Sequence, residues 1–309
     1  MSLSYKINKV VITGVTGFIG AALAKELLKR GVIVYGIGRN FDDLDFIDSY
    51  KNFHKIVLEF DDYCNISKII IDKNIDVFIH VAYAGVSGKS KQNYCVQISN
   101  LEVACTTVEQ AVKMGCGRYL YVGSVDEYEI VRKPDELFIP PNHSRIYATI
   151  KYASEIIGKV IAYENNLEYV GALLALTYGE GNKSDILPNI IIRNSVNNQS
   201  TNLINGDNHY DMIYIDEAVN GIIAVAENGK SYESYYVGHE TLKTFKELVE
   251  EISVFVGNKG PLKFGQYPDP PFAINYNEID REKIYRDTGF RCMIDLQNAI
   301  LKTKNWLAD

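Results

Sequence analysis

Three glycines at regular spacing, placed between an apolar segment and a helix-like segment, constrain the fold of this chain more than any other feature. Lys9–Thr13 is apolar and mostly β-branched, which predicts a strand. Gly14, Gly17 and Gly20 follow it, and residues 21–30 then show the apolar spacing of a helix. This order predicts a strand, a tight turn and a helix that begins at the turn.

The same alternation continues along the first half of the chain. Gly31 ends the first helix, and the apolar segment 32–37 completes a strand–helix–strand unit. Further strands are predicted at 55–59, 77–81, 119–122 and 169–176, and further helices at 66–73, 99–114 and 147–164. Apolar strands that alternate with helices predict an α/β fold, with a Rossmann-type doubly wound parallel sheet buried on both faces.

Composition excludes several other classes of protein. The chain has 309 residues, 47% of them hydrophobic and 23% charged, which is typical of a globular protein. Its apolar runs are shorter than the roughly 18 residues that a membrane helix needs, so no membrane partner is expected. A net charge of −7 disfavours nucleic acid as a partner. Five cysteines without C-x-x-C pairing predict neither a disulfide framework nor a metal site, and the lack of a secretory signal predicts a cytoplasmic location.

The glycine-bearing turn has the features of a phosphate-binding loop. Glycines let the backbone approach a pyrophosphate, and the N-terminal end of a helix offers free N–H groups and positive dipole charge. A purely structural turn is the alternative, but the flanking strand–helix–strand unit favours dinucleotide binding. The residues predicted to contact the dinucleotide here are Gly14, Thr16, Gly17, Phe18, Ile19 and Gly20.

The second half of the chain has a different character, with more Asn, Ser and Gly and shorter predicted elements. Two strand-like segments, Met212–Ile215 and Tyr235–Val237, interrupt it. We therefore predict a dinucleotide-binding domain over residues 1–178 that also receives elements from about 210–238. A smaller, discontinuous and mainly substrate-binding region is predicted over 179–309.

The end of the second predicted strand bears on the choice between NAD and NADP. An NAD site usually presents a carboxylate there to the adenosine ribose, whereas an NADP site presents an arginine to the 2′-phosphate. This chain has Gly38 where the acid is expected and Arg39 directly after it, so NADP is the predicted cofactor. NAD stays possible, because Arg39 could be an ordinary surface residue and Asp42 or Asp43 could reach the ribose.

Two acidic residues after the third predicted strand are further cofactor candidates. Asp61 could accept a hydrogen bond from the adenine amine, and Asp62 is its neighbour. Both could equally be solvated turn residues.

A tyrosine and a lysine four residues apart form the second informative pattern. On a helix, Tyr147 and Lys151 project from one face, so a phenol and an ammonium reach the same region. A nearby cation stabilises a phenolate and brings a tyrosine toward acid–base chemistry near neutral pH. Such a pair also occurs by chance on surface helices, so it gains meaning only in combination with other motifs.

Those other motifs are present. Ser124 follows the predicted strand YLYVG and precedes Tyr147 and Lys151. Further matching segments are His80–Ala84, Asn100–Glu102, Tyr178–Gly179, Asp211–Ala218 and Asp280–Phe290. Together with the glycine turn, these motifs resemble the extended short-chain dehydrogenase/reductase family, and within it the nucleotide-sugar epimerases, dehydratases and reductases, over nearly the whole chain.

The resemblance implies roles for three residues. Tyr147 is the general acid–base at a sugar hydroxyl or ketone, and Ser124 orients the same oxygen. Lys151 binds the nicotinamide ribose and lowers the pKa of the phenol. Tyr147 and Lys151 are therefore both catalytic and cofactor-binding residues, and the expected substrate is a nucleotide sugar.

Residues around these positions are further binding candidates. Val81, Ala82 and Tyr83 are expected to contact the cofactor at the end of the fourth predicted strand. Tyr83 is also a substrate candidate, although an ordinary packed aromatic residue is an equal alternative. Val125 and Asp126, next to Ser124, are expected to contact substrate.

The segment after Ser124 favours one reaction. Dehydratases of this group place two acids directly after the catalytic hydroxyl residue, because elimination needs both an acid and a base. Here Val125 intervenes and displaces Asp126 and Glu127 by one position, which turns side chains at a strand end toward opposite faces. We therefore predict NADPH-dependent reduction of a keto-sugar nucleotide.

Two alternatives stay open. An epimerase that oxidises and re-reduces one sugar carbon, while it retains NAD or NADP, would use the same three residues. A non-catalytic dinucleotide-binding sensor or scaffold is the other alternative, but such a protein would be expected to lose Tyr147 and Lys151, which are present.

Groups that commonly bind the nucleotide diphosphate in the family are missing from their expected positions, which hold Leu173, Leu176 and Tyr210. Loss of arginine removes bidentate phosphate binding. Either Arg193 or Lys183 replaces those groups, or the substrate is not a typical nucleotide sugar.

A homodimer is a possible assembly. Many members of the family pair through two helices, for which 99–114 and 147–164 are the candidates. Burial of both helices against the sheet explains the same apolar pattern.

Overall fold

A seven-stranded sheet organises the computed structural model, which describes residues 6–42, 44–130, 144–268 and 274–308. Its strands are β1 (Lys9–Thr13), β2 (Ile33–Gly38), β3 (Phe53–Val57), β4 (Val77–His80), β5 (Arg118–Ser124), β6 (Glu168–Leu174) and β11 (Ser234–Val237). Neighbouring strands are parallel throughout, in the order β11-β6-β5-β4-β1-β2-β3. The predicted doubly wound α/β fold is confirmed.

The sheet reverses its winding between β1 and β4. The chain passes from β1 to β2 and β3 on one side, then crosses back to place β4, β5 and β6 on the other side. Ligands of such sheets bind at the carboxyl edge beside the reversal point. The glycine turn follows β1 and Val81 follows β4, so both lie at that edge.

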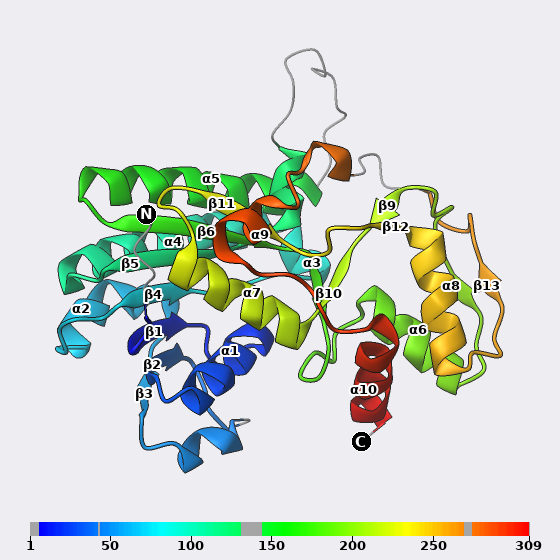
Figure 1. Ribbon diagram of the computed structural model, residues 1–309, viewed down its shortest axis with the longest axis horizontal. Coiled ribbons are helices and arrows are strands. Elements are labelled where there is room, and N and C mark those ends of the chain that lie inside the picture. Colours follow the sequence, from blue (N-terminus) through cyan, green and yellow to red (C-terminus); the bar gives the residue numbers. More distant parts are fainter. Residues whose placement is uncertain (1–5, 43, 131–143, 269–273, 309) are drawn as a thin grey trace.

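Helices cover both faces of the sheet (Figure 1). The pair α1 (Phe18–Lys29) and α7 (Ile215–Asn228) packs on one face, and the pair α4 (Tyr94–Met114) and α5 (Ser144–Glu164) packs on the other. All of β4 and all but the last residue of β5 are buried, as expected for strands between two helical layers. Among the described residues, none of the helices combines the length and apolarity needed to cross a membrane.

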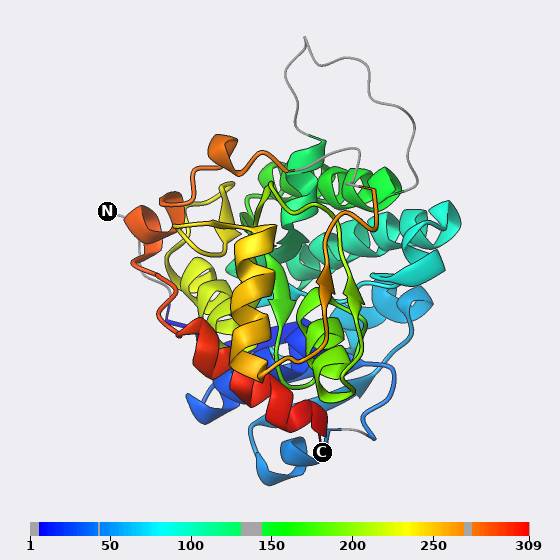
Figure 2. The same cartoon turned by 90° about the vertical axis from the view of Figure 1, so that its right-hand side faces the viewer.

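The residues after β7 (Leu176–Tyr178) build most of a second region beside the sheet, which faces the viewer in Figure 2. Its main helices are α6 (Leu187–Val196), α8 (Phe245–Val256) and α10 (Leu296–Ala308). Between them the chain returns to the sheet through α7 and β11.

Short elements connect these parts. The remaining strands are β8 (Thr201–Asn202), β9 (His209–Tyr210), β10 (Met212–Tyr214), β12 (Lys243–Thr244) and β13 (Leu262–Lys263). The remaining α-helices are α2 (Ile66–Ile69), α3 (Gly88–Lys91) and α9 (Lys283–Thr288), and the 3-10 helices are η1 (Asp45–Ser49), η2 (Phe60–Asn65), η3 (Val125–Glu129) and η4 (Tyr276–Glu278).

Several predicted elements differ in their bounds from the observed ones. The predicted helix 66–73 ends at Ile69, and the predicted strand 55–59 is observed as β3 at Phe53–Val57. The predicted strand 169–176 is divided at Ala175, whose N–H donates to the carbonyl of Val237, and β7 then leaves the sheet to pair with β10. The predicted helix 99–114 begins earlier, at Tyr94. The Asn93 side chain caps it by accepting the N–H groups of Cys95 and Val96.

Candidate active site

A cleft of about 950 Å³ lies between the carboxyl edge of the sheet and the C-terminal region. The sequence-predicted site residues that line it are Gly14, Thr16, Gly17, Phe18, Ile19, Gly20, Arg39, Asp61, Val81, Ala82, Tyr83, Ser124, Val125, Asp126, Tyr147 and Lys151. Within the described parts of the chain, Asp62 and Arg193 are not among the lining residues. The folded chain therefore brings most of the predicted residues to one cavity.

The glycine turn packs closely against its own backbone and against the segment that follows β4. Gly14 has a φ of +69°, and a Cβ on it would lie 2.7 Å from the Cα of Ala82. A Cβ on Gly20 would overlap the carbonyl oxygen of Gly14. The helix that follows has Gly17 as its N-cap, without a side-chain hydrogen bond to its first turn. The turn thus leaves helix N–H groups available at the cleft for an anion.

The end of the cleft beside β2 continues into a recess of about 320 Å³. Arg39, directly after β2, lines both the recess and the main cleft, as do Thr16 and Glu59. Sequence analysis missed Glu59, although its position two residues before Asp61 gave a weak signal. The alternative ribose partner Asp42 accepts a hydrogen bond from the Asn40 side chain at 2.8 Å, and Asp43 lies outside the described residues.

Lys151 lies in the interior of the site on α5. Its ammonium donates to the carbonyl of Val122 at 2.9 Å and lies 4.2 Å from the centre of the Tyr83 ring. Burial lowers the pKa of Lys151 to about 8, although the carboxylates of Glu127 and Asp126 act in the opposite direction. The ammonium is thus fixed beside the end of β5, within the lining of the cleft.

Tyr147 lies one helical turn before Lys151. Its ring contacts Tyr83 edge to face, with centroids 5.3 Å apart, and the Lys91 ammonium lies 4.3 Å from its centre. Burial and the Asp126 carboxylate hold the pKa of Tyr147 well above its usual range, while a hydrogen bond with Ser124 lowers it. We expected a pKa brought down by Lys151. Instead burial raises the pKa of the phenol, so the phenol keeps its proton at neutral pH. The Lys151 ammonium donates to the carbonyl of Val122.

Ser124 ends β5 and caps η3. Its hydroxyl accepts the N–H of Asp126 at 3.2 Å, and its own N–H donates to Glu127 at 2.8 Å. This capping box fixes the serine at the edge of the cleft, beside the phenol. Its structural and functional roles are compatible, because a hydroxyl has a further lone pair and a proton to offer.

Both acids after Ser124 are engaged with other groups. Asp126 pairs with Lys91 at 2.8 Å at the surface of the cleft. Glu127 is only 1% exposed, and burial together with the neighbouring Glu155 carboxylate raises its pKa well above the usual range. Sequence analysis missed Lys91, because a lysine in a polar segment carries no motif.

We call the part of the cleft lined by residues in 174–177, 182–186, 210–211 and 274–276 the substrate end, and none of these described lining residues is a lysine or an arginine. The cationic residues among the described lining residues are Arg39, Lys91 and Lys151. Arg193 instead pairs with Asp185 at 2.5 Å and donates to the carbonyl of Lys183. The described residues that line this end and that sequence analysis did not identify include Leu174, Ala175, Thr177, Asn182, Ser184, Ile186, Asp211, Ile274 and Tyr276.

Leu173, Leu176 and Tyr210, which stand where diphosphate-binding groups were expected, do not all line the cleft. Leu176 and Tyr210 line the cleft, whereas Leu173 is a buried residue of β6 and does not belong to the described lining. Lys183, the other proposed replacement, lies 5.3 Å from the ring of Trp306.

Comparisons with known proteins found similar sequences and folds over most of the chain. The family model described as "NAD dependent epimerase/dehydratase family" matches residues 10–238. The chain is 25% identical to dTDP-4-dehydro-6-deoxyglucose reductase from Escherichia coli, over 96% of both chains. It is 23% identical to CDP-abequose synthase from Yersinia pseudotuberculosis, over 90% of this chain and 97% of that protein. The structure of the dTDP-glucose 4,6-dehydratase DesIV from Streptomyces venezuelae with NAD bound has a TM-score of 0.81 at 19% identity, with 97% of each chain covered.

Proposed function

We propose that this chain, which belongs to the NAD dependent epimerase/dehydratase family, uses NADPH to reduce the keto group of a nucleotide sugar. The family match and the relatives among nucleotide-sugar enzymes confirm the resemblance to extended short-chain dehydrogenase/reductases. The chain is therefore a nicotinamide-dependent nucleotide-sugar enzyme. The reaction, the choice of NADP and the site residues are the parts that we propose.

The glycine turn fits a dinucleotide. Gly14 and Gly20 occupy positions where a Cβ would meet backbone atoms, so the chain can come close to a pyrophosphate only with glycine there. Asp61 and Phe60 line the same end of the cleft, while Val81 and Ala82 lie beside the turn. When bound, the reduced nicotinamide supplies hydride to a carbonyl carbon.

Tyr147 is the proposed proton donor. Because burial keeps its phenol protonated, Tyr147 has a proton to give to the carbonyl oxygen as negative charge develops there. The Ser124 hydroxyl is placed to donate a hydrogen bond to the same oxygen. Lys151 lines the same cleft one helical turn after Tyr147, and we propose that its ammonium contributes positive charge to the site as the phenol loses its proton.

One observation favours reduction over dehydration: no free pair of acids stands beside Tyr147 among the described lining residues. Val125 does not titrate, Asp126 is neutralised by Lys91, and Glu127 is buried beneath the serine. Elimination of water needs an acid for the leaving hydroxyl and a base for the adjacent proton. Reduction of a ketone needs only the single proton that Tyr147 carries.

Arg39 supports NADP. It directly follows β2 and lines the recess together with Thr16, and in NADP sites an arginine near this strand end accommodates the 2′-phosphate. Glu59 lines the same recess and is the group that would favour an unmodified ribose, so the preference depends on these two residues.

The following test distinguishes a reductase from an epimerase. Purified protein is denatured and the released dinucleotide is quantified, and the intact protein is then assayed for NADPH consumption with dTDP-4-dehydro-6-deoxyglucose and its CDP, UDP and GDP counterparts. A reductase is expected to release little dinucleotide and to consume NADPH with one of these ketones. Stoichiometric retained dinucleotide without NADPH consumption would instead indicate an epimerase.

We also propose a homodimer through α4 and α5. These adjacent helices expose apolar side chains, including Ile98 (52%), Val160 (51%) and Tyr163 (70%). Val160→Glu should convert a dimer to a monomer in light scattering at equal concentration, whereas Val254→Glu, on the exposed face of α8, should not. A wild-type monomer would contradict the proposal.

A further inference from the structure

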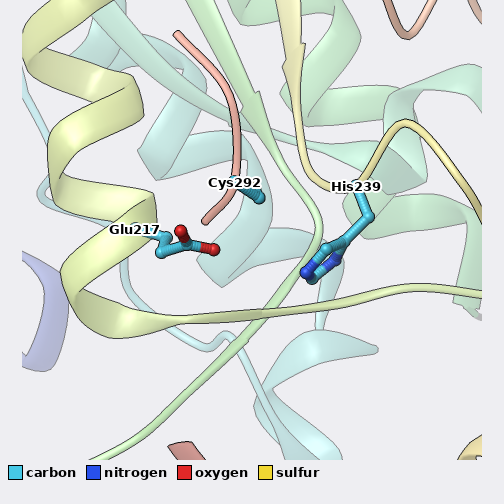
Figure 3. Close-up of side chains that lie close together, drawn as sticks. All are labelled: Glu217, His239 and Cys292. Carbon is cyan, nitrogen blue, oxygen red and sulfur yellow. The ribbon is translucent and has the colours of Figure 1, made fainter. Parts of the chain in front are cut away.

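We propose that Glu217, His239 and Cys292 form a binding site for a divalent transition-metal ion of the zinc class. One carboxylate oxygen, one imidazole nitrogen and the thiol sulfur all lie within 4.8 Å of one another. Figure 3 shows the three side chains pointing toward a common space from three separate segments. Zinc binds oxygen, nitrogen and sulfur ligands together, and a water molecule would complete a tetrahedral shell.

The histidine is oriented for metal binding. Its Nδ1 lies 2.7 Å from one oxygen of Asp211, and its backbone N–H donates to the other oxygen at 2.8 Å. The hydroxyl of Tyr236 also donates to Asp211. With Nδ1–H donated to a carboxylate, the lone pair lies on Nε2, which is the arrangement that supports many histidine ligands of metals.

The other two ligands are held by backbone contacts. Glu217 is 4% exposed, and one of its oxygens accepts the N–H groups of Met293 and Ile294. Because these residues follow Cys292, the same contact places the thiol beside the carboxylate. The thiol also donates to the carbonyl of Gly238 at 3.3 Å, directly before His239. The three segments are therefore joined to one another before any ion binds.

The donor types of the cluster suit a divalent ion. A carboxylate and a thiolate both carry negative charge when they bind a metal, and the imidazole binds through a neutral nitrogen. A bound ion would therefore have two anionic donors and one neutral donor among these three side chains.

The proposed site joins the segment after α9 to the first turn of α7 and to the end of β11. Asp211 also lines the cleft, so the ion would stabilise the wall of the cleft from behind. The cysteine spacing gave no sign of this site, because its ligands lie at positions 217, 239 and 292 and a single cysteine takes part.

The test uses chelator-treated protein titrated with Zn²⁺ against a chromophoric indicator, and with Co²⁺ followed by absorbance. We expect one equivalent of metal per chain and a thiolate-to-cobalt charge-transfer band. Asp211→Asn should weaken Zn²⁺ binding by about 10- to 100-fold through loss of histidine orientation. Cys292→Ser and His239→Gln, which remove ligands, should each weaken it by more than that.

Matched controls separate ligand loss from misfolding. Cys64→Ser, at an exposed cysteine outside the cluster, should keep the stoichiometry and the cobalt band. Metal-free Cys292→Ser should melt like the metal-free wild type, and Zn²⁺ should raise the melting temperature of the wild type alone. If Cys292→Ser does not fold, His239→Gln gives the decisive affinity. Absence of saturable binding to the wild type, or a cobalt band that survives in Cys292→Ser, would overturn the site.

Discussion

The cofactor end and the substrate end of the cleft are built in different ways. At the cofactor end, short segments directly after β1, β2, β3 and β4 supply most of the lining. At the substrate end, the lining comes from four separated segments, 174–177, 182–186, 210–211 and 274–276. The first end belongs to one repeating pattern of strands and turns, whereas the second depends on how distant parts of the chain meet.

This difference explains what each end can recognise. We propose that the glycine turn offers backbone N–H groups to a pyrophosphate, which every dinucleotide contains, so that recognition at this end depends on backbone geometry. The substrate end offers Tyr210, Asn182 and Ser184, and none of its described lining residues is a lysine or an arginine, so its specificity rests on individual side chains. Four predictions, in order of expected effect, test how far this contrast holds.

The largest effect is expected where the two ends meet, at the phenol. Tyr147→Phe should lower turnover by about 100- to 10,000-fold, because the proton donor is removed, while dinucleotide binding stays nearly unchanged. Steady-state rates and a binding titration would measure both. Tyr83→Phe, which removes only a hydroxyl bonded to Gln97, should have a much smaller effect. Wild-type turnover in Tyr147→Phe would contradict its assigned role.

At the cofactor end, Arg39 should decide between dinucleotides. Arg39→Ala should weaken NADP by about 10- to 100-fold, through loss of charge-assisted hydrogen bonds to the 2′-phosphate, and should change NAD little. Calorimetric titration with both dinucleotides provides the measurement. Glu59→Gln, in the same recess, should weaken NAD more than NADP. An equal loss of both dinucleotides in Arg39→Ala would assign the arginine a structural role.

Lys151 should set the alkaline limit of activity. With a pKa of about 8, its ammonium is present below that pH and is lost as the pH rises, while Tyr147 stays protonated because its pKa lies well above 10. We expect kcat/KM to fall about tenfold per pH unit above that limit. Lys151→Arg, which does not titrate in this range, should lower the rate and remove the alkaline limb. A limb that persists unchanged in Lys151→Arg would exclude the lysine as its source.

The smallest effects distinguish Lys91, which lines the cleft, from Arg193, which is not among the described lining residues. Lys91 contacts Asp126 and the Tyr147 ring, so Lys91→Ala should reduce kcat/KM by roughly fivefold, close to 1 kcal/mol. Arg193 makes its described contacts with Asp185 and Lys183, so Arg193→Ala should change kcat/KM by less than about twofold. Kinetics of the two variants with one substrate would show the order. A larger loss of kcat/KM in Arg193→Ala than in Lys91→Ala would indicate that Arg193 contributes to substrate binding.

The sequence predicted the parts of this protein that follow local rules. The parallel sheet, the glycine turn and the helix that carries Tyr147 and Lys151 each have a periodicity or spacing that a chain displays directly. The division of the predicted strand 169–176 was missed, because it depends on the distant partners Val237 and β10. Lys91 was missed for the same reason: its importance comes from contacts with residues far along the chain.

The residue types and their spacing did not predict the protonation states of the site residues. The spacing of Tyr147 and Lys151 indicated that they share a helix face, but it could not show that the ammonium donates to the carbonyl of Val122. The burial that keeps the phenol protonated also depends on the contacts of Tyr83 and Lys91 with the Tyr147 ring. The roles could be proposed from the resemblance that these motifs carry, whereas the protonation states depend on the folded environment.

The most direct test of the central claim follows hydride itself. The enzyme is incubated with NADPH that carries deuterium at C4 of the nicotinamide, on the face from which hydride leaves. The substrates are dTDP-4-dehydro-6-deoxyglucose and its CDP, UDP and GDP counterparts. The masses of the products are then measured by mass spectrometry. Our account predicts a reduced sugar that carries one deuterium, formed by the wild type and lost in Tyr147→Phe. An unlabelled product with every ketone, or a product lighter by one water, would contradict it.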